Sequence, residues 1–379
     1  ARALDVKDVC DQLIGLLKEE GHGPDNMKEP AILAADSLNA SELMRMDRSR
    51  ILGIITRQGS PLSHVSILAG IWDIPAVSGL EIDESMNGKE AVVDGESGRI
   101  FVEPDIRTLS LYEKRYAGIL MKREMLGRLK GREDITLSGQ RVDILANIGN
   151  EGDLDQAVRN DARGVGLLRT EFLYSQAKDY PDELSQLLIY RRIARRIKDM
   201  PLIIRTLDIR EDKRPAYFAP DREKEKEILR TQLRAILRAS AFGNIKILYP
   251  MIFSVKQLRE IKETFESVKD ELGGEGLDFK DIEQGIMVET PAAVLISMEL
   301  AKEADFFSIG TNDLTRLTLA ADESSPDISG MLKEGLETIL EMIRTSISNA
   351  HLAGIKAGIC GEMAGDLSLT ERFVSMGVD

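Results

Sequence analysis

The sequence contains few of the residues from which disulfide frameworks and Cys/His metal sites are built. Its 379 residues include two cysteines and three histidines, namely Cys10, Cys360, His22, His64 and His351. The cysteines are far apart in sequence and form no disulfide framework, and the histidines are too few for a metal site of Cys/His spacing. The chain also lacks a Walker sequence and a Gly-x-Gly-x-x-Gly loop, which argues against the common nucleotide-phosphate loops.

Long apolar runs and excess positive charge are missing as well. No apolar stretch approaches the ~18–20 residues that span a bilayer, and residues 1–6 carry no signal-peptide core. We therefore expect a cytoplasmic protein with no membrane partner. The net charge of −14 argues against nucleic acid as a partner, because phosphate backbones call for a basic face. A small phosphorylated substrate is compatible with this charge, since it needs only a few focused Arg or Lys side chains.

The first hundred residues have the pattern of a compact α/β unit. We predict an amphipathic helix at 7–19, strands at 31–35, 51–56, 74–77 and 91–94, and a closing hairpin that reaches residue 102. A long helix is predicted over 107–130, where Lys, Arg, Leu and Met abound and proline is absent. The simple interpretation of this helix is a linker.

From about residue 141, strands alternate with helices, which is typical of a parallel β/α architecture. Seven strands are predicted, at 142–148, 164–172, 202–209, 245–251, 285–290, 305–311 and 356–361. A closed (β/α)₈ barrel needs an eighth strand. Residues 375–379 resemble the start of one, so we expect a TIM-type barrel that is truncated before its last strand.

Polar side chains stand where several of these strands end, and the carboxyl ends of strands are where α/β barrels assemble their sites. Glu289 and Asp313 can jointly hold a hard cation, and Mg²⁺ fits because it uses one or two carboxylates. The alternative is that both carboxylates cap the helices that follow. For Glu289 the two interpretations are evenly matched.

Arg169 and Arg205 each end an apolar run with Arg-Thr, which places a guanidinium at the predicted barrel mouth. Such side chains suit the recognition of phosphate and carboxylate. The alternative is a buried ion pair, for example with Glu171 or Asp208. Two of the predicted strands have an arginine near their carboxyl end, and two have a carboxylate there. This combination favours a site for an anionic substrate that is bridged by a metal.

Cys360 lies at another strand end. A buried core cysteine is the commonest case, but a thiol of ordinary pKa, ~8.5, is protonated at neutral pH and can donate a proton to carbon. The nearby glycines, Gly310, Gly358 and Gly361, are interpreted as positions where backbones approach closely.

His64 follows the predicted strand 51–56 and opens a helix. The first turn of a helix has unpaired N–H groups and a positive dipole end, which favour a neutral, nucleophilic imidazole and stabilise a phosphoryl group on it. The alternative is a capping or surface histidine.

Together these residues resemble Enzyme I, the phosphoenolpyruvate-protein phosphotransferase family of the bacterial sugar phosphotransferase system. The longest matching segments are LRAILRASAF at 233–242, VETPAA at 288–293, DFFSIGTNDLT at 305–315 and CGEMAGD at 360–366. Pyruvate phosphate dikinase and phosphoenolpyruvate synthase share the architecture.

The resemblance implies a swivelling phosphohistidine domain at 1–105, a linker helix at 106–135 and a phosphoenolpyruvate-binding TIM barrel at 136–379. The resemblance further leads us to expect that the family's helical carrier-binding module is absent from this chain. A homodimer through the barrel is implied too.

The roles implied are those of a phosphotransferase. His64 would take the phosphoryl group from phosphoenolpyruvate and pass it to the histidine phosphocarrier protein, and Cys360 would protonate the enolate to give pyruvate. Arg169, Arg205 and Asn312 would bind substrate, while Glu289 and Asp313 would hold Mg²⁺.

Some positions depart from the family pattern. Glu323 stands where the family has a phosphate-binding arginine, the loop 59–64 is altered, and a segment that carries another arginine is missing between residues 217 and 228. These departures support a second hypothesis, a catalytically degenerate relative that binds a metabolite or a partner. A dikinase or synthase fragment is a third hypothesis.

Overall fold

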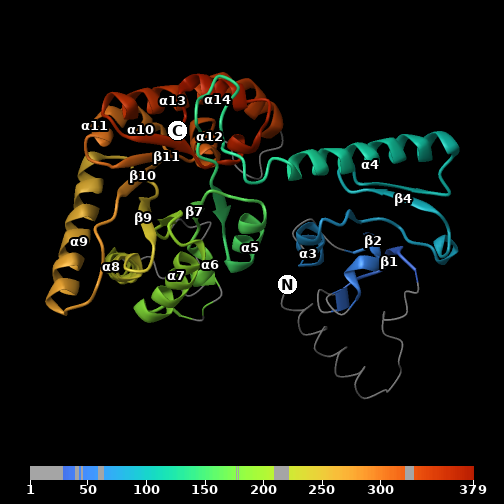
Figure 1. The fold of residues 1–379 in the computed structure, drawn as a ribbon, viewed down its shortest axis with the longest axis horizontal. Coiled ribbons are helices and arrows are strands. Elements are labelled where there is room, and N and C mark those ends of the chain that lie inside the picture. The colour runs from blue at the N-terminus through green and yellow to red at the C-terminus, as the bar shows by residue number, and fades with distance from the viewer. Residues whose placement is uncertain are drawn as a thin grey trace, which may run out of the picture. The chain divides into compact units, whose positions relative to one another are not determined.

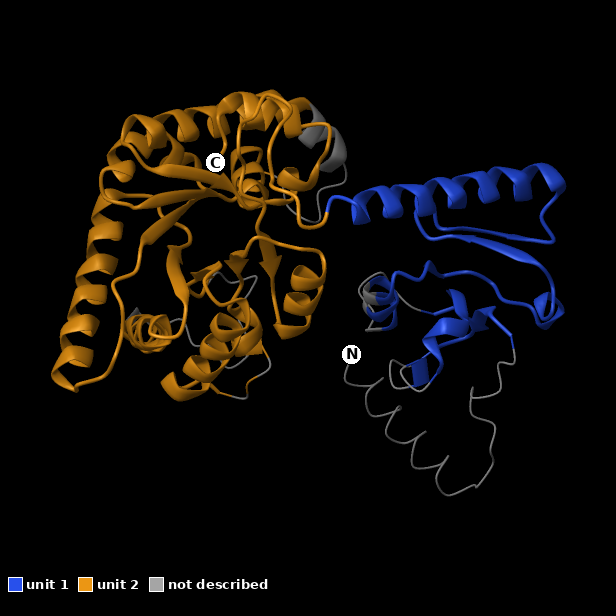
Figure 2. Ribbon diagram, viewed as in Figure 1, with its two compact units in different colours: residues 1–129 blue, residues 130–379 orange. Residues whose placement is uncertain are grey.

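The computed structural model describes residues 29–38, 42–43, 46–58, 64–175, 177, 179–208, 222–320 and 328–379. By its contacts the chain divides into two compact units, residues 1–129 and residues 130–379 (Figure 2). The helix predicted at 7–19 lies outside the described residues, as do most of the altered loop before His64, the region 209–221 and Glu323. None of the helices in the described ranges is long and apolar enough to cross a bilayer.

The first unit contains a small parallel sheet with strand order β1-β2-β3. Its strands are β1 (Ala31–Ala35), β2 (Ile51–Thr56) and β3 (Ala76–Ser78), and α3 (His64–Trp72) connects the last two. The strands predicted at 31–35 and 51–56 are confirmed, and the third begins two residues later than predicted. A small apolar core of Leu43, Met46, Ile51, Ile54, Val65 and Ala69 joins the sheet to the helix. Short 3₁₀ turns occur at Arg48–Arg50 and Glu84–Met86.

An antiparallel hairpin of β4 (Ala91–Asp94) and β5 (Arg99–Val102) precedes the long helix α4 (Ile106–Gly127), as predicted. Asp105 caps α4 by accepting a hydrogen bond of 2.6 Å from Thr108 N–H. The helix packs on the hairpin through Tyr112 and Arg115, which both bond the buried carboxylate of Asp94 at 3.1 Å. These contacts make α4 part of the first unit.

The second unit is a curled parallel sheet covered by helices (Figure 1). In the described residues its seven strands lie in the order β12-β11-β10-β9-β8-β7-β6, which is chain order reversed, and each of the seven predicted strands is present. The strands are β6 (Ala146–Ile148), β7 (Val165–Leu168), β8 (Pro201–Arg205), β9 (Asn244–Tyr249), β10 (Gln284–Val288), β11 (Phe306–Ile309) and β12 (Lys356–Ile359). All seven are shorter than predicted.

The helices of this unit alternate with the strands. They are α5 (Glu151–Arg159), α6 (Glu171–Ser175), α7 (Glu183–Ile197), α8 (Arg222–Ser240), α9 (Val255–Gly274), α10 (Pro291–Leu295), α11 (Ser297–Ala301), α12 (Thr311–Thr318), α13 (Ile328–Leu352) and α14 (Thr370–Met376), with a 3₁₀ turn at Glu362–Gly365. Side-chain caps fix several starts; for example, Asp182 and Ser254 accept from the third residue of α7 and α9. These caps fix where α7 and α9 begin, whereas α11, α12 and α14 begin without a side-chain cap.

Alternation along the strands creates two apolar layers. Outward-facing residues such as Leu168, Ile204 and Val288 pack in the main core beneath the helices. Their inward-facing neighbours Leu167, Leu248, Met287, Phe306 and Cys360 form a separate cluster inside the curl. This period of two is a property of extended chain, so it extends to the residue just past each strand.

The two edge strands of the curled sheet, β6 and β12, approach each other. At their carboxyl ends, Asn147 Nδ2 donates to Cys360 O over 2.9 Å. At their amino ends, Asp379 lies between them: its N–H donates to Ala357 O over 3.1 Å and its carbonyl accepts from Asp143 N–H over 2.9 Å. Asp379 therefore bridges the amino ends of the two edge strands.

Candidate active site

Strand alternation directs four of the predicted site residues to the inner face of the sheet. Arg169, Arg205 and Glu289 each stand two positions beyond an inner-layer residue, namely Leu167, Ile203 and Met287, and Cys360 belongs to the inner layer itself. All four are at the carboxyl ends of strands, as the sequence predicted. Their charges influence one another, since Arg205 acts on the pKa values of both Glu289 and Cys360.

Arg205 is buried and forms an ion pair. Its Nη2 lies 2.6 Å from Glu171 Oε1, and its Nη1 lies 3.8 Å from Met287 Sδ. The buried-pair alternative is thus confirmed, with Glu171 as the partner. Burial works against the charged form of Arg205, but Glu171, Glu289 and Asp208 outweigh it and raise its pKa. Arg205 Nε and Glu171 Oε2 are both buried without a hydrogen-bond partner, so the pair retains unused bonding capacity.

Glu289 is almost completely buried, and its Oε1 accepts a 2.7 Å hydrogen bond from Met251 N–H. Burial raises the pKa of Glu289 to about 7; the Met251 amide and Arg205 oppose the rise, and the charges of Asp313 and Asp208 add to it. The capping alternative is wrong for Glu289, because Thr290 is the residue that caps α10, accepting from Ala293 N–H at 3.0 Å. A buried carboxylate without a capping role calls for another explanation.

Asp313 lies in the first turn of α12, and its Oδ1 is 3.1 Å from Arg316 Nη2. Within the described ranges, no group of three or more His, Cys, Asp or Glu side chains could hold a metal. A pair of acidic oxygens such as Glu289 and Asp313 is nevertheless enough for Mg²⁺, which takes its other ligands from water and substrate. The charge of Asp313 adds to the burial that raises the pKa of Glu289, and a divalent cation between the two carboxylates would relieve that repulsion.

Asn312 and Cys360 lie on neighbouring strand ends. Asn312 Oδ1 accepts a 2.8 Å hydrogen bond from Glu362 N–H, which ties α12 to the loop after β12. The thiol of Cys360 is buried, and its Sγ is 3.5 Å from Ile309 O. Burial raises the pKa of Cys360 to about 11, so the thiol keeps its proton at neutral pH.

Two of the three glycines are indeed positions of close approach. A Cβ on Gly361 would lie 1.8 Å from Thr311 Oγ1, and one on Gly310 would lie 3.0 Å from Glu289 Cβ. The prediction is wrong for Gly358, because a Cβ there would meet nothing within 4 Å.

The structure does not bring every predicted residue into the described site. The backbone of His64 begins α3 in the first unit, but its side chain lies outside the described residues. Arg169 is on the same inner face as Arg205 and is exposed. The sequence did not predict Asn147, whose side chain bonds Cys360 O, or Gln232, whose amide is buried among the helices and strand ends. The available signal for Gln232 was a polar residue at the helical spacing of the apolar face of α8, which also carries Ile228, Ala235 and Ala239.

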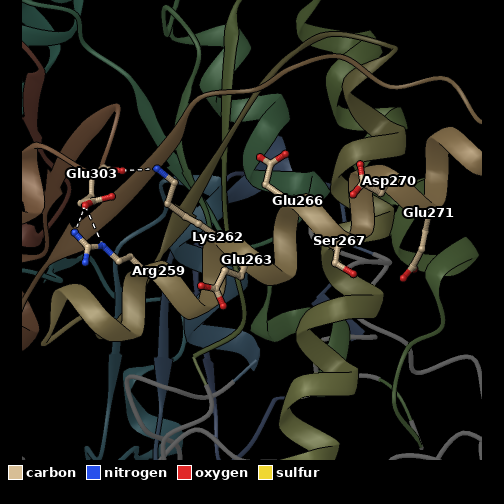
Figure 3. Close-up of a pocket in the computed structure, with 8 residues that line it drawn as sticks. All are labelled: Arg259, Lys262, Glu263, Glu266, Ser267, Asp270, Glu271 and Glu303. Carbon is tan, nitrogen blue, oxygen red and sulfur yellow. Dashed lines mark hydrogen bonds and ion pairs between the residues drawn. The ribbon is translucent and has the colours of Figure 1, made fainter.

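Two hollows in the second unit differ in character. One of 880 Å³ lies along α9, where Figure 3 shows Arg259 and Lys262 turned toward Glu303. Its lining is charged and its cations are already bonded, so we assign it no chemistry. The other, of 280 Å³, lies inside the curled sheet and has Cys360, Ser308 and Asn147 in its wall. Of the predicted site residues in the described ranges, Cys360 alone lines the smaller hollow, whose wall extends to the amino ends of the strands at Pro201, Lys246 and Lys356.

Comparison with known proteins identifies the class of protein that carries this site. Residues 123–379 match the PEP-binding domain of PEP-utilising enzymes, and residues 27–98 match the mobile domain of the same enzymes. The chain belongs to the family of PEP-utilising enzymes.

Its relatives define a narrower group. The phosphoenolpyruvate-protein phosphotransferase of Haemophilus influenzae is 37% identical over 396 aligned residues, which cover 100% of this chain and 69% of the relative. Those of Bacillus subtilis and of Buchnera aphidicola from Acyrthosiphon pisum are 36% and 38% identical and are covered to 70% and 69%. Within its class the chain thus belongs with the phosphoenolpyruvate-protein phosphotransferases, which are enzymes. The aligned length exceeds the 379 residues of the chain, so the relatives carry residues that this chain lacks.

Proposed function

We propose that this chain transfers the phosphoryl group of phosphoenolpyruvate to His64 and on to the histidine phosphocarrier protein, releasing pyruvate. The observation that carries the proposal is the convergence of Arg205, Glu289 and Cys360 on one inner strand edge, with Arg169, Asn312 and Asp313 beside them. Family membership supports phosphoenolpyruvate-dependent phosphotransfer. The residue roles and the carrier partner are our proposal.

We assign substrate binding to Arg169, Arg205 and Asn312. Arg205 Nε is buried and unbonded, so it can donate to an anionic oxygen of phosphoenolpyruvate without first losing another bond. Arg169 lies on the same inner face and is accessible, which suits a second contact to phosphate or carboxylate. Asn312 adds a neutral donor at the neighbouring strand end.

Glu289 and Asp313 are proposed to hold Mg²⁺, which when bound supplies charge neutralisation for the departing phosphoryl group. Glu289 is fixed in place by the Met251 amide, so the carboxylate position is set before any cation arrives. Removal of divalent cations is therefore expected to abolish phosphoryl transfer.

The bond between phosphorus and the enol oxygen breaks, and a bond forms between phosphorus and an imidazole nitrogen of His64. The enolate that remains takes a proton on carbon from the Cys360 thiol, which gives pyruvate. The thiolate then recovers a proton from solvent. Burial of Cys360 keeps its proton available until the enolate forms.

The test is labelling with radioactive phosphoenolpyruvate and Mg²⁺. Acid-labile label should appear on the chain, be absent from His64→Ala and pass to added phosphocarrier protein. A matched control is His351→Ala, since His351 bonds Asp379 at the amino end of β12. Label that persists in His64→Ala would overturn the proposal. Sedimentation of the same sample tests the implied homodimer.

The degenerate-relative hypothesis rests on Glu323, on the segment between residues 217 and 228 and on the altered loop 59–64. Glu323 and residues 59–63 and 217–221 lie outside the described residues. Glu323→Arg tests it directly. A wild-type chain that takes up no label, together with a labelled Glu323→Arg variant, would favour degeneracy over the proposal. No observation in the described residues favours the dikinase or synthase hypothesis.

A further inference from the structure

A chain of buried hydrogen bonds lies beneath the ends of β7 and β8. Its centre is Gln232, a residue of α8 whose side chain has no exposed surface. Gln232 Oε1 accepts a hydrogen bond of 2.8 Å from Leu207 N–H, and its Nε2 donates bonds of 3.1 Å to Thr170 Oγ1 and to the Tyr190 hydroxyl. Thr170 and Tyr190 are fully buried too, so no solvent competes for these bonds.

The direction of each bond is fixed by its neighbours. A backbone N–H can only donate, so the amide oxygen of Gln232 must face Leu207 and its NH₂ group must face the two hydroxyls. Thr170 then donates its own proton to Arg205 O over 3.0 Å, and Tyr190 donates to Gln186 Oε1 over 3.1 Å. Each group in this series of hydrogen bonds therefore has one possible role as donor or acceptor, and removing one group leaves its partners without a hydrogen bond.

This series of hydrogen bonds ends at the two backbone segments that carry Arg169 and Arg205. Thr170 directly follows Arg169, and Leu207 is two residues beyond Arg205. Gln232 therefore joins the end of β7 to the end of β8 through one rigid amide. The Arg205 carbonyl is held by Thr170, and its guanidinium is held separately by Glu171.

We infer that Gln232 is a positioning residue for anion binding: it sets the spacing of the Arg169 and Arg205 backbones, and so the spacing at which their guanidiniums meet phosphoenolpyruvate. The inference rests on the proposed function. Gln232 is buried under the strand ends and does not itself touch substrate. Its effect depends on geometry, because small displacements of binding groups strongly weaken interactions that need defined distances.

The experiment measures phosphoenolpyruvate affinity by calorimetry at saturating Mg²⁺. Gln232→Met keeps the length of the side chain and removes the amide. We expect its Kd to rise about tenfold, which corresponds to ~1.4 kcal/mol. The matched control is Gln284→Met: Gln284 is also a buried glutamine that bonds a buried tyrosine, Tyr249, over 2.8 Å, but it lies at the amino end of β10. The control should lose stability with its Kd unchanged.

A second pair of variants keeps the inference testable if Gln232→Met does not fold. Thr170→Val removes the hydroxyl that links Gln232 to the Arg205 carbonyl, whereas Thr170→Ser retains it. The valine variant should reproduce the weaker binding, and the serine variant should bind as wild type. A purely structural role would lower stability without this difference in Kd.

A double-mutant comparison with Arg205 distinguishes a positioning role of Gln232 from a general loss of structure. If Gln232 acts through the arginines, Gln232→Met should weaken binding much less in an Arg205→Lys background than alone. Equal losses in both backgrounds, or wild-type affinity in Gln232→Met and Thr170→Val, would overturn the inference and leave the proposed function standing. A wild-type chain that binds no phosphoenolpyruvate would instead overturn the proposed function, and the inference with it.

Discussion

The ion pair between Arg205 and Glu171 gives the most direct test of the candidate site. In Glu171→Ala the guanidinium of Arg205 stays buried, with its side chain 6% exposed, and loses its hydrogen-bonded carboxylate at 2.6 Å. Two unit charges ~4 Å apart interact by ~4 kcal/mol at an effective dielectric constant of ~20. Removing one partner of a buried pair typically costs ~3–5 kcal/mol, because the other charge is left uncompensated. Because Glu289 and Asp208 still act on Arg205 in this variant, we expect the lower end of this range, a loss of about 3 kcal/mol in the free energy of unfolding of the second unit.

The assay is urea unfolding followed by two signals. Far-ultraviolet circular dichroism reports on both units, whereas fluorescence reports on the first, since the single tryptophan is Trp72. The circular dichroism transition should move to lower urea, and the fluorescence transition should stay in place.

The matched control for this assay is Glu337→Ala. Glu337 also makes two short bonds to an arginine, Arg372, but at the surface. This variant should unfold as wild type does, because exposed pairs add little. If Glu171→Ala unfolds like the control, the structural assignment of a buried, mutually dependent pair is wrong.

Three further predictions concern other parts of the molecule. Gly361→Ala should lower the melting temperature strongly and Gly358→Ala should not, because a Cβ at 361 would lie 1.8 Å from Thr311 Oγ1 and one at 358 would meet nothing; equal melting temperatures would contradict this. The Ser97 hydroxyl and other donors lower the pKa of Asp94 to about 2 from 3.8, so its contribution is present above pH 3.8 and lost as the pH falls through about 2. Asp94→Asn should therefore make the tryptophan-monitored stability of the first unit less dependent on pH in that window, and an unchanged dependence would count against the assignment. Burial raises the pKa of Cys360 from 9.0 to about 11, so its contribution to stability is present below pH 9.0 and lost as the pH rises through about 11; Cys360→Ala should lose less stability than wild type between these pH values, as circular dichroism melting can check.

The strand framework could be predicted from sequence because it depends on local pattern. Apolar runs followed by short polar residues located all seven strands of the second unit and placed Arg205, Glu289 and Cys360 at their ends. The same pattern placed the last residues of most strands too late, because pairing usually stops before the polar residues begin; β8 differs, since its pairing includes Arg205. At β7, for example, pairing ends at Leu168, whereas the predicted strand runs to residue 172.

Choices between long-range partners could not be predicted. Glu171 and Asp208 were equal candidates for Arg205 in sequence, and the curl of the sheet decided for Glu171. Capping by Thr290 rather than Glu289 depended on one side-chain hydrogen bond. Gln232 reaches two strand ends that are 25 and 62 residues away in sequence. No local pattern contains that information.

The alternation of inner and outer residues has a consequence for how the sheet can pair. A slip of β8 by one residue would move Arg205 from the inner face into the apolar layer that now holds Leu202 and Ile204. A slip of the chain around β10 would do the same to Glu289. Each such error buries an unpaired charge among apolar side chains, which is strongly unfavourable. The charged residues of the candidate site therefore also disfavour pairing of the strands in a wrong register. Substitutions that neutralise these residues should permit misaligned sheets as well as weaken binding.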